Sequence, residues 1–348
     1  MKLLVVGGKF GKTYLEAVKS SKNWEIAGIV AKTDETLKEV GKKYQIPEHV
    51  RFKDINLALE KSGCEAVAVA VPNWLHYEFA KKVIEANKHL ILEKPLTDTW
   101  EQAIELVRLL NSKTDLEGMA GQTLRGEVVN RMIEYVLKQE VIGNIESLTF
   151  ESHWYWIDDP NKSWRFTLPD MYLDDIGIHQ FDLIRMMLGN KRCKSVMAIA
   201  QKAKSYPLEI RTTCSSSMMF DDEIMVNYFG SMGTKGNPVG WQGNLAIYGE
   251  KGAIIKPEKA APYVDFYEKK EKILVEDIIG DDIESAIPLI DFTGIAYLLE
   301  DFYYAIKEHK DPITDLQDNL FSHQILLAHK RSADLGKNII LNQEFPFD

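Results

Sequence analysis

The sequence contains few cysteines and no long apolar run. Only three cysteines, Cys64, Cys193 and Cys214, occur in 348 residues. Their spacing fits neither a zinc site nor a disulfide framework, so we expect no metal site and a reducing, cytoplasmic location. The thiols are then small buried apolar groups. No apolar stretch approaches the roughly 20 residues that a membrane-spanning helix needs, so we expect no membrane partner.

The chain also lacks an excess of positive charge. Lys and Arg number 42 against 52 Asp and Glu, which gives a formal net charge of −10. General binding to DNA, RNA or anionic membranes depends on positive charge, so this balance argues against nucleic acid as a partner. Sequence repeats and low-complexity segments are absent too. A chain of this length is too long for one ordinary core and predicts two domains.

The first third of the chain alternates short apolar runs with helical patterns. The predicted strands are 3–6, 26–31, 66–71 and 89–92, and the predicted helices are 11–20, 35–44, 77–86 and 100–110. Continuous apolar strands separated by helices are typical of a parallel sheet that is covered on both faces. We therefore predict a doubly wound α/β domain over residues 1–120.

Residues 121–348 follow a different pattern. A predicted helix at 131–138 precedes strand-like runs at 145–156, 195–200, 224–229, 244–248 and 253–255, and helices at 297–306 and 319–332 close the chain. Glycine-rich turn signals, such as Gly-Glu-Lys-Gly at 249–252, lie between the runs. This pattern predicts a C-terminal α/β domain with a large, mostly antiparallel open sheet.

A glycine-rich turn follows the first predicted strand. It consists of Gly7, Gly8, Lys9, Phe10 and Gly11. Glycines allow a tight turn and a close approach of the backbone to a pyrophosphate, and the helix that follows offers free N–H groups. The spacing departs from G-x-G-x-x-G, because Val6 stands at the first position. The place of the cluster after the first strand still favours a nucleotide site over a plain turn.

The end of the second predicted strand bears on the choice of cofactor. An acid at this position would bind the ribose 2′-hydroxyl of NAD. Here Ala31 occupies the position and Lys32 follows it, which favours a 2′-phosphate and therefore NADP(H) over NAD(H). The alternative is that Lys32 is an ordinary surface lysine and that Asp34 binds the ribose.

Two further motifs follow predicted strands. Pro72, Asn73 and His76 come after strand 66–71, and Glu93-Lys94-Pro95 comes after strand 89–92. Because α/β sheets bind ligands at the carboxyl ends of their strands, we expect both motifs beside the cofactor, with Lys94 at the mouth of the sheet. The structural alternatives are a helix cap for Asn73 and an exposed loop lysine.

Residues 175–188 have helical periodicity and carry three polar groups. Asp175, His179 and Asp182 fall at i, i+4 and i+7, so a regular helix places them on one face. An acid one turn from a histidine can orient the imidazole and raise its pKa. The alternatives are a solvated helix face and acids that favour the helix N-terminus.

Taken together, these motifs resemble the Gfo/Idh/MocA oxidoreductases, the glucose–fructose oxidoreductase and inositol dehydrogenase group. The glycine turn, Glu93-Lys94-Pro95, Trp164-Arg165 and the Asp175-to-His179 helix carry the resemblance. It implies a Rossmann domain, a second domain whose sheet forms homodimer or homotetramer contacts, and catalysis by Lys94, Asp175 and His179 on a sugar, polyol or nucleotide-linked sugar. The side chains expected on the substrate side are Arg125, Tyr155, Trp164, Arg165 and Asp182.

Two departures from the family pattern leave alternatives open. The first glycine of the turn is missing, and Tyr14 stands where many members have histidine. Residues 5–17 also resemble the thiazolinyl imine reductase branch, which reduces a C=N bond with NADPH and does not keep the Lys94 and Asp175/His179 pattern. The main hypothesis is an oxidoreductase in which His179 takes the hydroxyl proton and Lys94 hydrogen-bonds the same oxygen. The alternatives are an imine reductase, a non-catalytic cofactor-binding regulator and, more remotely, a glycosidase with bound NAD.

Overall fold

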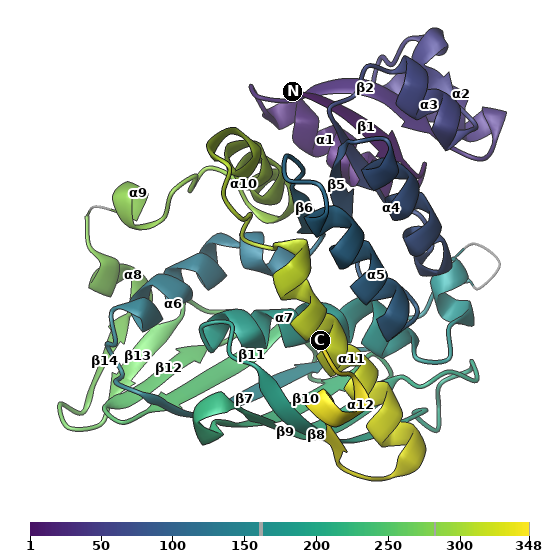
Figure 1. Ribbon diagram of the computed structural model, residues 1–348. Coiled ribbons are helices and arrows are strands. Elements are labelled where there is room, and N and C mark those ends of the chain that lie inside the picture. Colours follow the sequence, from purple (N-terminus) through teal and green to yellow (C-terminus); the bar gives the residue numbers. More distant parts are fainter. Residues whose placement is uncertain (160–162, 282, 348) are drawn as a thin grey trace. The chain divides into compact units, whose positions relative to one another are not determined.

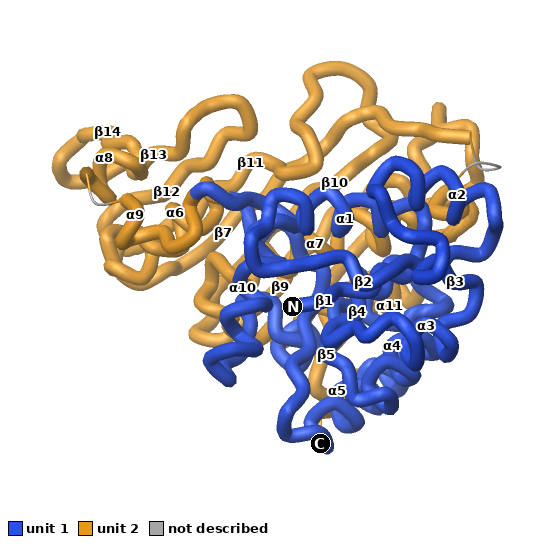
Figure 2. The backbone as a smooth tube through the Cα atoms, turned by 90° about the horizontal axis from the view of Figure 1, so that it is seen from above, with its two compact units in different colours: residues 1–127, 291–320 blue, residues 128–290, 321–348 orange. Residues whose placement is uncertain are grey.

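The computed structural model describes residues 1–159, 163–281 and 283–347. Its backbone forms two compact units, shown in Figure 2. Unit 1 comprises Met1–Glu127 and Asp291–Leu320, and unit 2 comprises Val128–Ile290 and Phe321–Asp348. The chain thus leaves unit 1 and later returns to it. A linear division into domains 1–120 and 121–348 stays a prediction.

Unit 1 is built around a six-stranded parallel sheet (Figure 1). In spatial order the strands are β3 (Arg51–Phe52), β2 (Glu25–Val30), β1 (Lys2–Val6), β4 (Ala66–Val69), β5 (His89–Leu92) and β6 (Gly118–Ala120). The strand order reverses between β1 and β4, and doubly wound sheets bind ligands at the carboxyl ends of such strands. The central strands are almost wholly buried, as their continuous apolar runs predict.

Side-chain caps begin three of the helices described in unit 1. The helices of this unit are α1 (Gly11–Ser20), α2 (Asp34–Lys43), α3 (Ile55–Lys61), α4 (His76–Glu85), α5 (Trp100–Asn111) and α10 (Gly294–Glu308). Side-chain oxygens of Thr33, Asp54 and Thr99 accept hydrogen bonds from backbone N–H groups in the first turns of α2, α3 and α5. Such caps satisfy donors that the helix itself leaves unpaired.

The returning segment is tied to unit 1 by hydrogen bonds between residues far apart in the sequence. The indole nitrogen of Trp24 donates to the carbonyl of Leu299 over 2.8 Å. Beside β6, the backbone N–H of Ala120 donates to the carbonyl of Thr314 over 2.9 Å, and the Thr314 hydroxyl donates back to the Ala120 carbonyl over 2.7 Å. Residues 291–320 therefore complete the edge of the first sheet.

Unit 2 contains a nine-stranded, mostly antiparallel sheet, which confirms the predicted α/β fold class. In spatial order the strands are β14 (Glu271–Leu274), β13 (Tyr263–Phe266), β12 (Gly252–Lys256), β11 (Val239–Gly249), β7 (Ile145–His153), β10 (Met225–Ser231), β9 (Thr213–Phe220), β8 (Cys193–Gln201) and β15 (Ile339–Ile340). Among the pairings described within this nine-stranded sheet, only the β7–β10 pair is parallel.

Helices cover one face of this sheet. The helices associated with unit 2 are α6 (Val128–Lys138), α7 (Ile178–Met187), α8 (Val275–Ile279), α9 (Ile283–Ala286), α11 (Leu316–Leu335, from residue 321 onward) and α12 (Leu341–Glu344). Two side chains of α11 bond to the sheet: His329 to the Ser216 hydroxyl, and Ser332 to the backbone N–H of Ala198. Within residues 1–159, 163–281 and 283–347, the length and apolar content of every helix fall short of what a membrane crossing needs.

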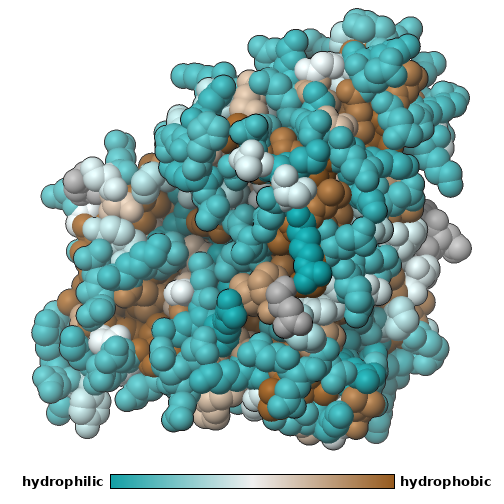
Figure 3. Space-filling view, viewed as in Figure 1, coloured by the Kyte–Doolittle hydropathy of each residue, from teal (hydrophilic) through white to brown (hydrophobic). Residues whose placement is uncertain are grey.

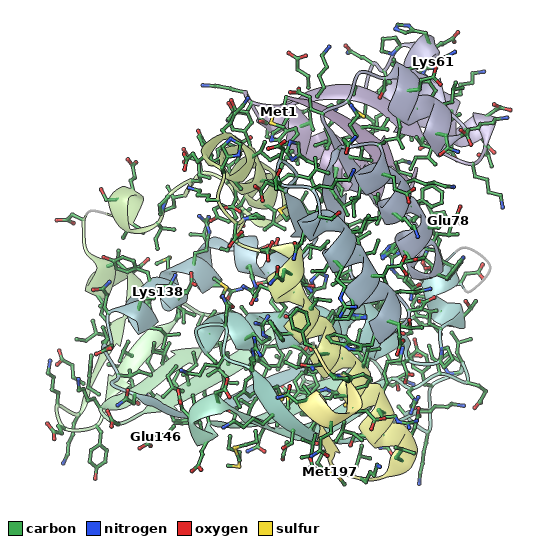
Figure 4. The ribbon with its side chains drawn as sticks, in the orientation of Figure 1. Met1, Lys61, Glu78, Lys138, Glu146 and Met197 are labelled. Atoms are coloured by element: carbon green, nitrogen blue, oxygen red, sulfur yellow. The ribbon has the colours of Figure 1, made fainter. Side chains whose placement is uncertain are left out.

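The other face of the sheet carries exposed apolar side chains. The strand registers place Met197, Ile199, Met225, Phe229 and Tyr248 on this same face. Each of them is at least 37% exposed, and Met197 is labelled in Figure 4. By contrast, the view in Figure 3 shows a largely hydrophilic surface with apolar residues scattered across it.

Replacing Trp24 by Phe should lower the free energy of unfolding by about 0.5–1.5 kcal/mol, because it removes the buried hydrogen bond from the indole to the carbonyl of Leu299. Urea denaturation measures the change. Tyr267→Phe is the matched control, since Tyr267 is 83% exposed, and it should shift stability by less than about 0.5 kcal/mol. Equal stability of Trp24→Phe and the wild type would show that this hydrogen bond does not hold the returning segment.

Candidate active site

The glycine turn after β1 is closely packed against neighbouring backbone. Gly7 has φ +116°, a conformation that favours glycine, and its N–H donates to the carbonyl of Val30 over 2.9 Å. A Cβ atom at Gly7 would overlap the carbonyl of Ala70, and one at Gly8 would overlap the side chain of Thr36. Gly7 therefore serves the tight turn in place of the missing first glycine.

The start of α1 suits an anion. The helix begins at Gly11, no side chain caps it, and its first turn contains no acid. The backbone N–H groups and the positive dipole end at the start of a helix are the features that bind pyrophosphate in doubly wound folds. Lys9 is exposed and Phe10 is half-buried in the same turn. These residues fit a dinucleotide.

The end of β2 carries no acid. Ala31 is buried, with its Cβ atom 3.3 Å from where a Cβ at Gly8 would lie, and Lys32 is exposed. The carboxylate of Asp34, the alternative ribose ligand, pairs with the ammonium of Lys53 over 2.6 Å. Both side chains of this pair are exposed, so the ion pair is weak.

His76 joins the loops that follow β4 and β5. Its ring is 1% exposed, and the two ring nitrogens lie 2.9 Å from the carbonyl of Val71 and 2.7 Å from the carbonyl of Pro95. Burial lowers the pKa of His76 to about 4, although the two carbonyls act to raise it. A place for His76 beside the cofactor stays a prediction. Its ring nitrogens lie against two backbone carbonyls, and the neutral ring donates to one of them, so His76 links the loop after β4 to the Lys94–Pro95 segment.

Next to this histidine, Asn73 presents a buried side-chain oxygen. The residue is 6% exposed, and its Oδ1 atom has no hydrogen-bond partner within the described residues. A buried acceptor of this kind costs free energy unless a donor reaches it. It lies on the turn after β4, where a cofactor amide or hydroxyl can supply that donor. Pro72 precedes it with extended backbone (ψ 143°).

Glu93 is part of a buried polar pair behind Lys94. Its carboxylate, in a residue 5% exposed, accepts a hydrogen bond of 2.6 Å from the hydroxyl of Tyr14 on α1. Burial and the nearby Glu93 charge raise the pKa of Tyr14 well above its usual value, so the phenol stays neutral and donates. A Cβ at Gly121 would lie 2.5 Å from the same carboxylate. Glu93 thus anchors the loop, and the half-buried Lys94, joined to Pro95 by a cis peptide, follows it.

In unit 2 the helix that carries His179 is not regular. Residues Leu173–Gly177 form a π-helical turn, and α7 begins at Ile178. This corrects the expectation of one regular helix over 175–188, because apolar periodicity does not distinguish a π-turn from an α-turn. Such turns often occur at functional sites.

Asp175 lies in the π-turn and pairs with Arg165. Its carboxylate accepts a 3.0 Å hydrogen bond from Nε of Arg165, whose guanidinium lies 5.2 Å from the centre of the Trp164 ring. The structure therefore brings together three residues that the sequence analysis singled out separately. Orientation of His179 by Asp175 stays a prediction.

Gln180 and Trp241 lie beside His179, and no pattern in the sequence signalled either of them. Gln180 is fully buried and donates to the Ser152 hydroxyl and the Trp241 carbonyl, while its side-chain oxygen accepts from Tyr172 and Tyr228. The Trp241 ring lies edge-on to that of His179, with centroids 5.8 Å apart. Trp241 is 62 residues from His179, so no local pattern relates the two.

Arg125 and Asp182, two of the residues predicted on the substrate side, are buried and paired within the protein, and their place in substrate binding stays a prediction. Arg125 is 1% exposed, and its guanidinium donates to the Ile313 carbonyl and pairs with Asp318. Asp182, also 1% exposed, accepts a 2.6 Å hydrogen bond from the Ser322 hydroxyl. Sequence cannot separate a buried structural charge from one that faces a ligand.

Tyr155 contacts other aromatic and charged side chains of unit 2. Its ring is 38% exposed, contacts the ring of Tyr206, and has the ammonium of Lys235 at 5.0 Å. None of the interactions described for Tyr155 involves His179 or Asp175, and its place in substrate binding stays a prediction.

The pKa of His76 predicts a pH-dependent stability. The fold holds the ring neutral, whereas the unfolded chain binds a proton below about pH 6.5, so this stabilisation is complete above pH 6.5 and is lost as pH falls towards 4. A shift of this size corresponds to about 3 kcal/mol. We expect His76→Gln to be less stable than the wild type at pH 7, with the difference narrowing by pH 4 in urea denaturation. His49→Gln, at an exposed position, should give no such narrowing. A pH-independent difference for His76→Gln would contradict the assignment.

Comparisons with known proteins agree with this architecture. Residues 1–119 match the family described as "Oxidoreductase family, NAD-binding Rossmann fold", and residues 131–255 match the "GFO/IDH/MocA C-terminal domain". The 1,5-anhydro-D-fructose reductase of Ensifer adhaerens is 24% identical over 277 residues, covering 78% of each chain. Inositol 2-dehydrogenase of Arthrobacter sp. (strain FB24) is 23% identical over 235 residues, covering 65% of this chain and 67% of the relative.

A solved structure shares the fold along nearly the whole chain. An oxidoreductase from Agrobacterium radiobacter, in complex with NAD+, L-tartaric acid and magnesium, superposes with a TM-score of 0.86 over 99% of both chains at 17% identity. The Rossmann sheet of unit 1, the large sheet of unit 2 and the two family matches lead to one conclusion. The protein belongs to the Gfo/Idh/MocA family of oxidoreductases, with an NAD-binding Rossmann domain and the family's C-terminal domain.

Proposed function

We propose that this protein is an NADP(H)-preferring oxidoreductase that interconverts an alcohol and a ketone on a sugar or polyol. The observation that carries the proposal is the placement of Lys94. It follows β5 at the ligand-binding edge of the sheet, on a loop that His76 and the Tyr14–Glu93 pair fix from two sides. A cation that is fixed in this way is suited to stabilise negative charge on a substrate oxygen.

The residues that would hold the cofactor are those of the strand-end loops. The backbone of Gly7, Gly8 and Gly11 allows the pyrophosphate to approach the start of α1. The buried Oδ1 of Asn73 would accept a hydrogen bond from the cofactor. When bound, the nicotinamide supplies the acceptor or donor of the hydride.

The proposed chemistry needs one base and one hydrogen-bond donor. In oxidation, His179 takes the proton of the substrate hydroxyl group, while the carbon that bears this hydroxyl gives up a hydride. Lys94 donates a hydrogen bond to the same oxygen and stabilises its developing negative charge. In reduction, His179 returns the proton to that oxygen. Asp175, held by Arg165, orients the imidazole.

Relatives support a hydroxylated substrate. The names of the two curated relatives refer to an anhydro-sugar ketone and to inositol. Imine reduction stays the alternative, and activity on a cyclic imine but on no alcohol would establish it. The exposed apolar face of the unit 2 sheet supports the predicted homodimer or homotetramer. A cytoplasmic location remains a prediction from the sequence.

Replacing Lys94 by Met or His179 by Asn should lower kcat by about 10²–10⁴-fold, because each removes a group that acts in the transition state. The measurement is nicotinamide absorbance with the best alcohol from a panel of sugars, inositols and cyclic imines. Lys61→Met and His49→Asn change exposed residues and should leave kcat unchanged; Lys61 is labelled on α3 in Figure 4. Full turnover by both site variants would make the assignment wrong.

Lys32 should determine cofactor preference. We expect the wild type to favour NADPH over NADH by about 10-fold or more in kcat/KM, since a charge-assisted contact to the 2′-phosphate contributes about 1.5–3 kcal/mol. Lys32→Ala should lose most of that preference. Lys38→Ala, which removes an exposed lysine from α2, should retain it. A wild-type preference for NADH would contradict the proposed role of Lys32.

A further inference from the structure

The strand β11 is interrupted next to His179. Its pairing with β7 runs from Val239 opposite His153 to Asn244 opposite Glu151, and the register shifts in between. The interruption, residues 240–243, is hereafter called the β11 bulge. Gly243 has φ +69°, and a Cβ atom there would overlap the ring of Phe150. Bulges of this kind re-aim side chains and are frequent beside active sites.

Every backbone carbonyl of the β11 bulge accepts a hydrogen bond from a side chain. Ser152 donates to Gly240 over 2.9 Å, and Gln180 donates to Trp241 over 2.7 Å. The ammonium of Lys256 donates to Gln242 over 3.2 Å and to Gly243 over 3.1 Å.

The donors themselves are buried. Ser152 and Gln180 are fully buried, and Lys256 is 3% exposed. Burying an ammonium is costly unless hydrogen bonds compensate it, so a lysine in this place indicates that the shape of the bulge is strongly specified. The donors come from β7, α7 and β12, so three separate elements hold the bulge.

The side chain that the bulge displays is Trp241. Its ring is half-buried and lies 5.8 Å from the His179 ring at an interplanar angle of 64°. Gln180 donates to the Trp241 carbonyl and directly follows His179 in the helix. It therefore links the bulge to the turn of helix that carries His179. The other candidate indole, Trp164, already carries the Arg165 guanidinium over its ring.

We propose that Trp241 selects a cyclic substrate by packing against the C–H face of its ring, so that a ring hydroxyl is presented to His179. Aromatic side chains provide a rigid apolar surface whose two χ angles cost little entropy on binding. An acyclic polyol loses conformational entropy when it presents the same face, and this loss weakens its binding. This inference rests on the proposed function and names its substrate class.

The test compares two substrates that differ in ring closure. myo-Inositol and sorbitol both have six carbons and six hydroxyl groups, but only the first is cyclic. The ratio of kcat/KM for myo-inositol to that for sorbitol should fall at least 10-fold in Trp241→Ala, mainly through the KM for myo-inositol. Trp241→Phe keeps an aromatic face and should stay within about threefold of the wild type. Tyr267→Ala, a change at an exposed aromatic of unit 2, should not alter the ratio.

A second variant tests the bulge itself. Lys256→Met removes the donor to the carbonyls of Gln242 and Gly243 while keeping an apolar stem. It should lower the same ratio, by less than Trp241→Ala does, with the dissociation constant for NADPH unchanged. A general loss of activity on both substrates, without a change in the ratio, would show a merely structural lysine and would overturn this part of the inference.

Calorimetric titration of the NADP+-loaded protein separates the two proposals. If no alcohol is oxidised but myo-inositol binds more tightly than sorbitol, and Trp241→Ala abolishes that difference, the proposed reaction fails and the role of Trp241 stands. If both polyols turn over and Trp241→Ala leaves the ratio unchanged, the role of Trp241 fails and the reaction stands. If the protein neither oxidises nor binds either polyol, the proposed substrate class is overturned.

Discussion

Buried backbone carbonyls in loops and strand bulges, where regular pairing does not reach them, must receive hydrogen bonds from other groups, and this requirement shapes the candidate site regions of both units. In unit 1, His76 lies against the carbonyls of Val71 and Pro95 and so fixes the loop of Lys94. In unit 2, Ser152, Gln180 and Lys256 supply donors to four successive carbonyls beside His179. These side-chain contacts to backbone carbonyls stabilise the irregular backbone in both regions.

The same requirement explains why several buried polar residues near the candidate site residues are paired with each other. Glu93 and Tyr14 satisfy each other in the interior, and the neutral phenol lets the carboxylate remain buried. Asp182 and the Ser322 hydroxyl pair in a similar way in unit 2. Groups of this kind keep their neighbours in place, and removing one partner would leave the other buried without compensation. The roles proposed for Lys94 and His179 depend on a rigid support of this kind.

Local sequence predicted much of the fold. The periods of apolar residues located most strands and helices, including His89–Leu92 and Gly11–Ser20 with the same limits as in the structure. The strands β9 and β13 went unrecognised; β9 has four small polar residues, Ser and Thr, among its eight positions. Glycine chemistry and strand-end position also placed the cofactor loops, since both depend on a few adjacent residues. Trp241, Gln180 and the return of residues 291–320 to unit 1 depend on contacts across many tens of residues, which no local pattern encodes.

By itself the sequence determined the two-part α/β organisation, the glycine turn, the absence of an acid after β2 and the set of candidate site residues. These properties follow from local periodicity and residue chemistry. The tertiary structure decided which polar residues are buried with partners inside the protein, as with Arg125, Asp182 and His76, and which aromatic ring lies beside His179, as with Trp241. The physical reason is that burial and hydrogen-bond partners define what a charged or aromatic side chain can do, and both are set by parts of the chain that meet only on folding.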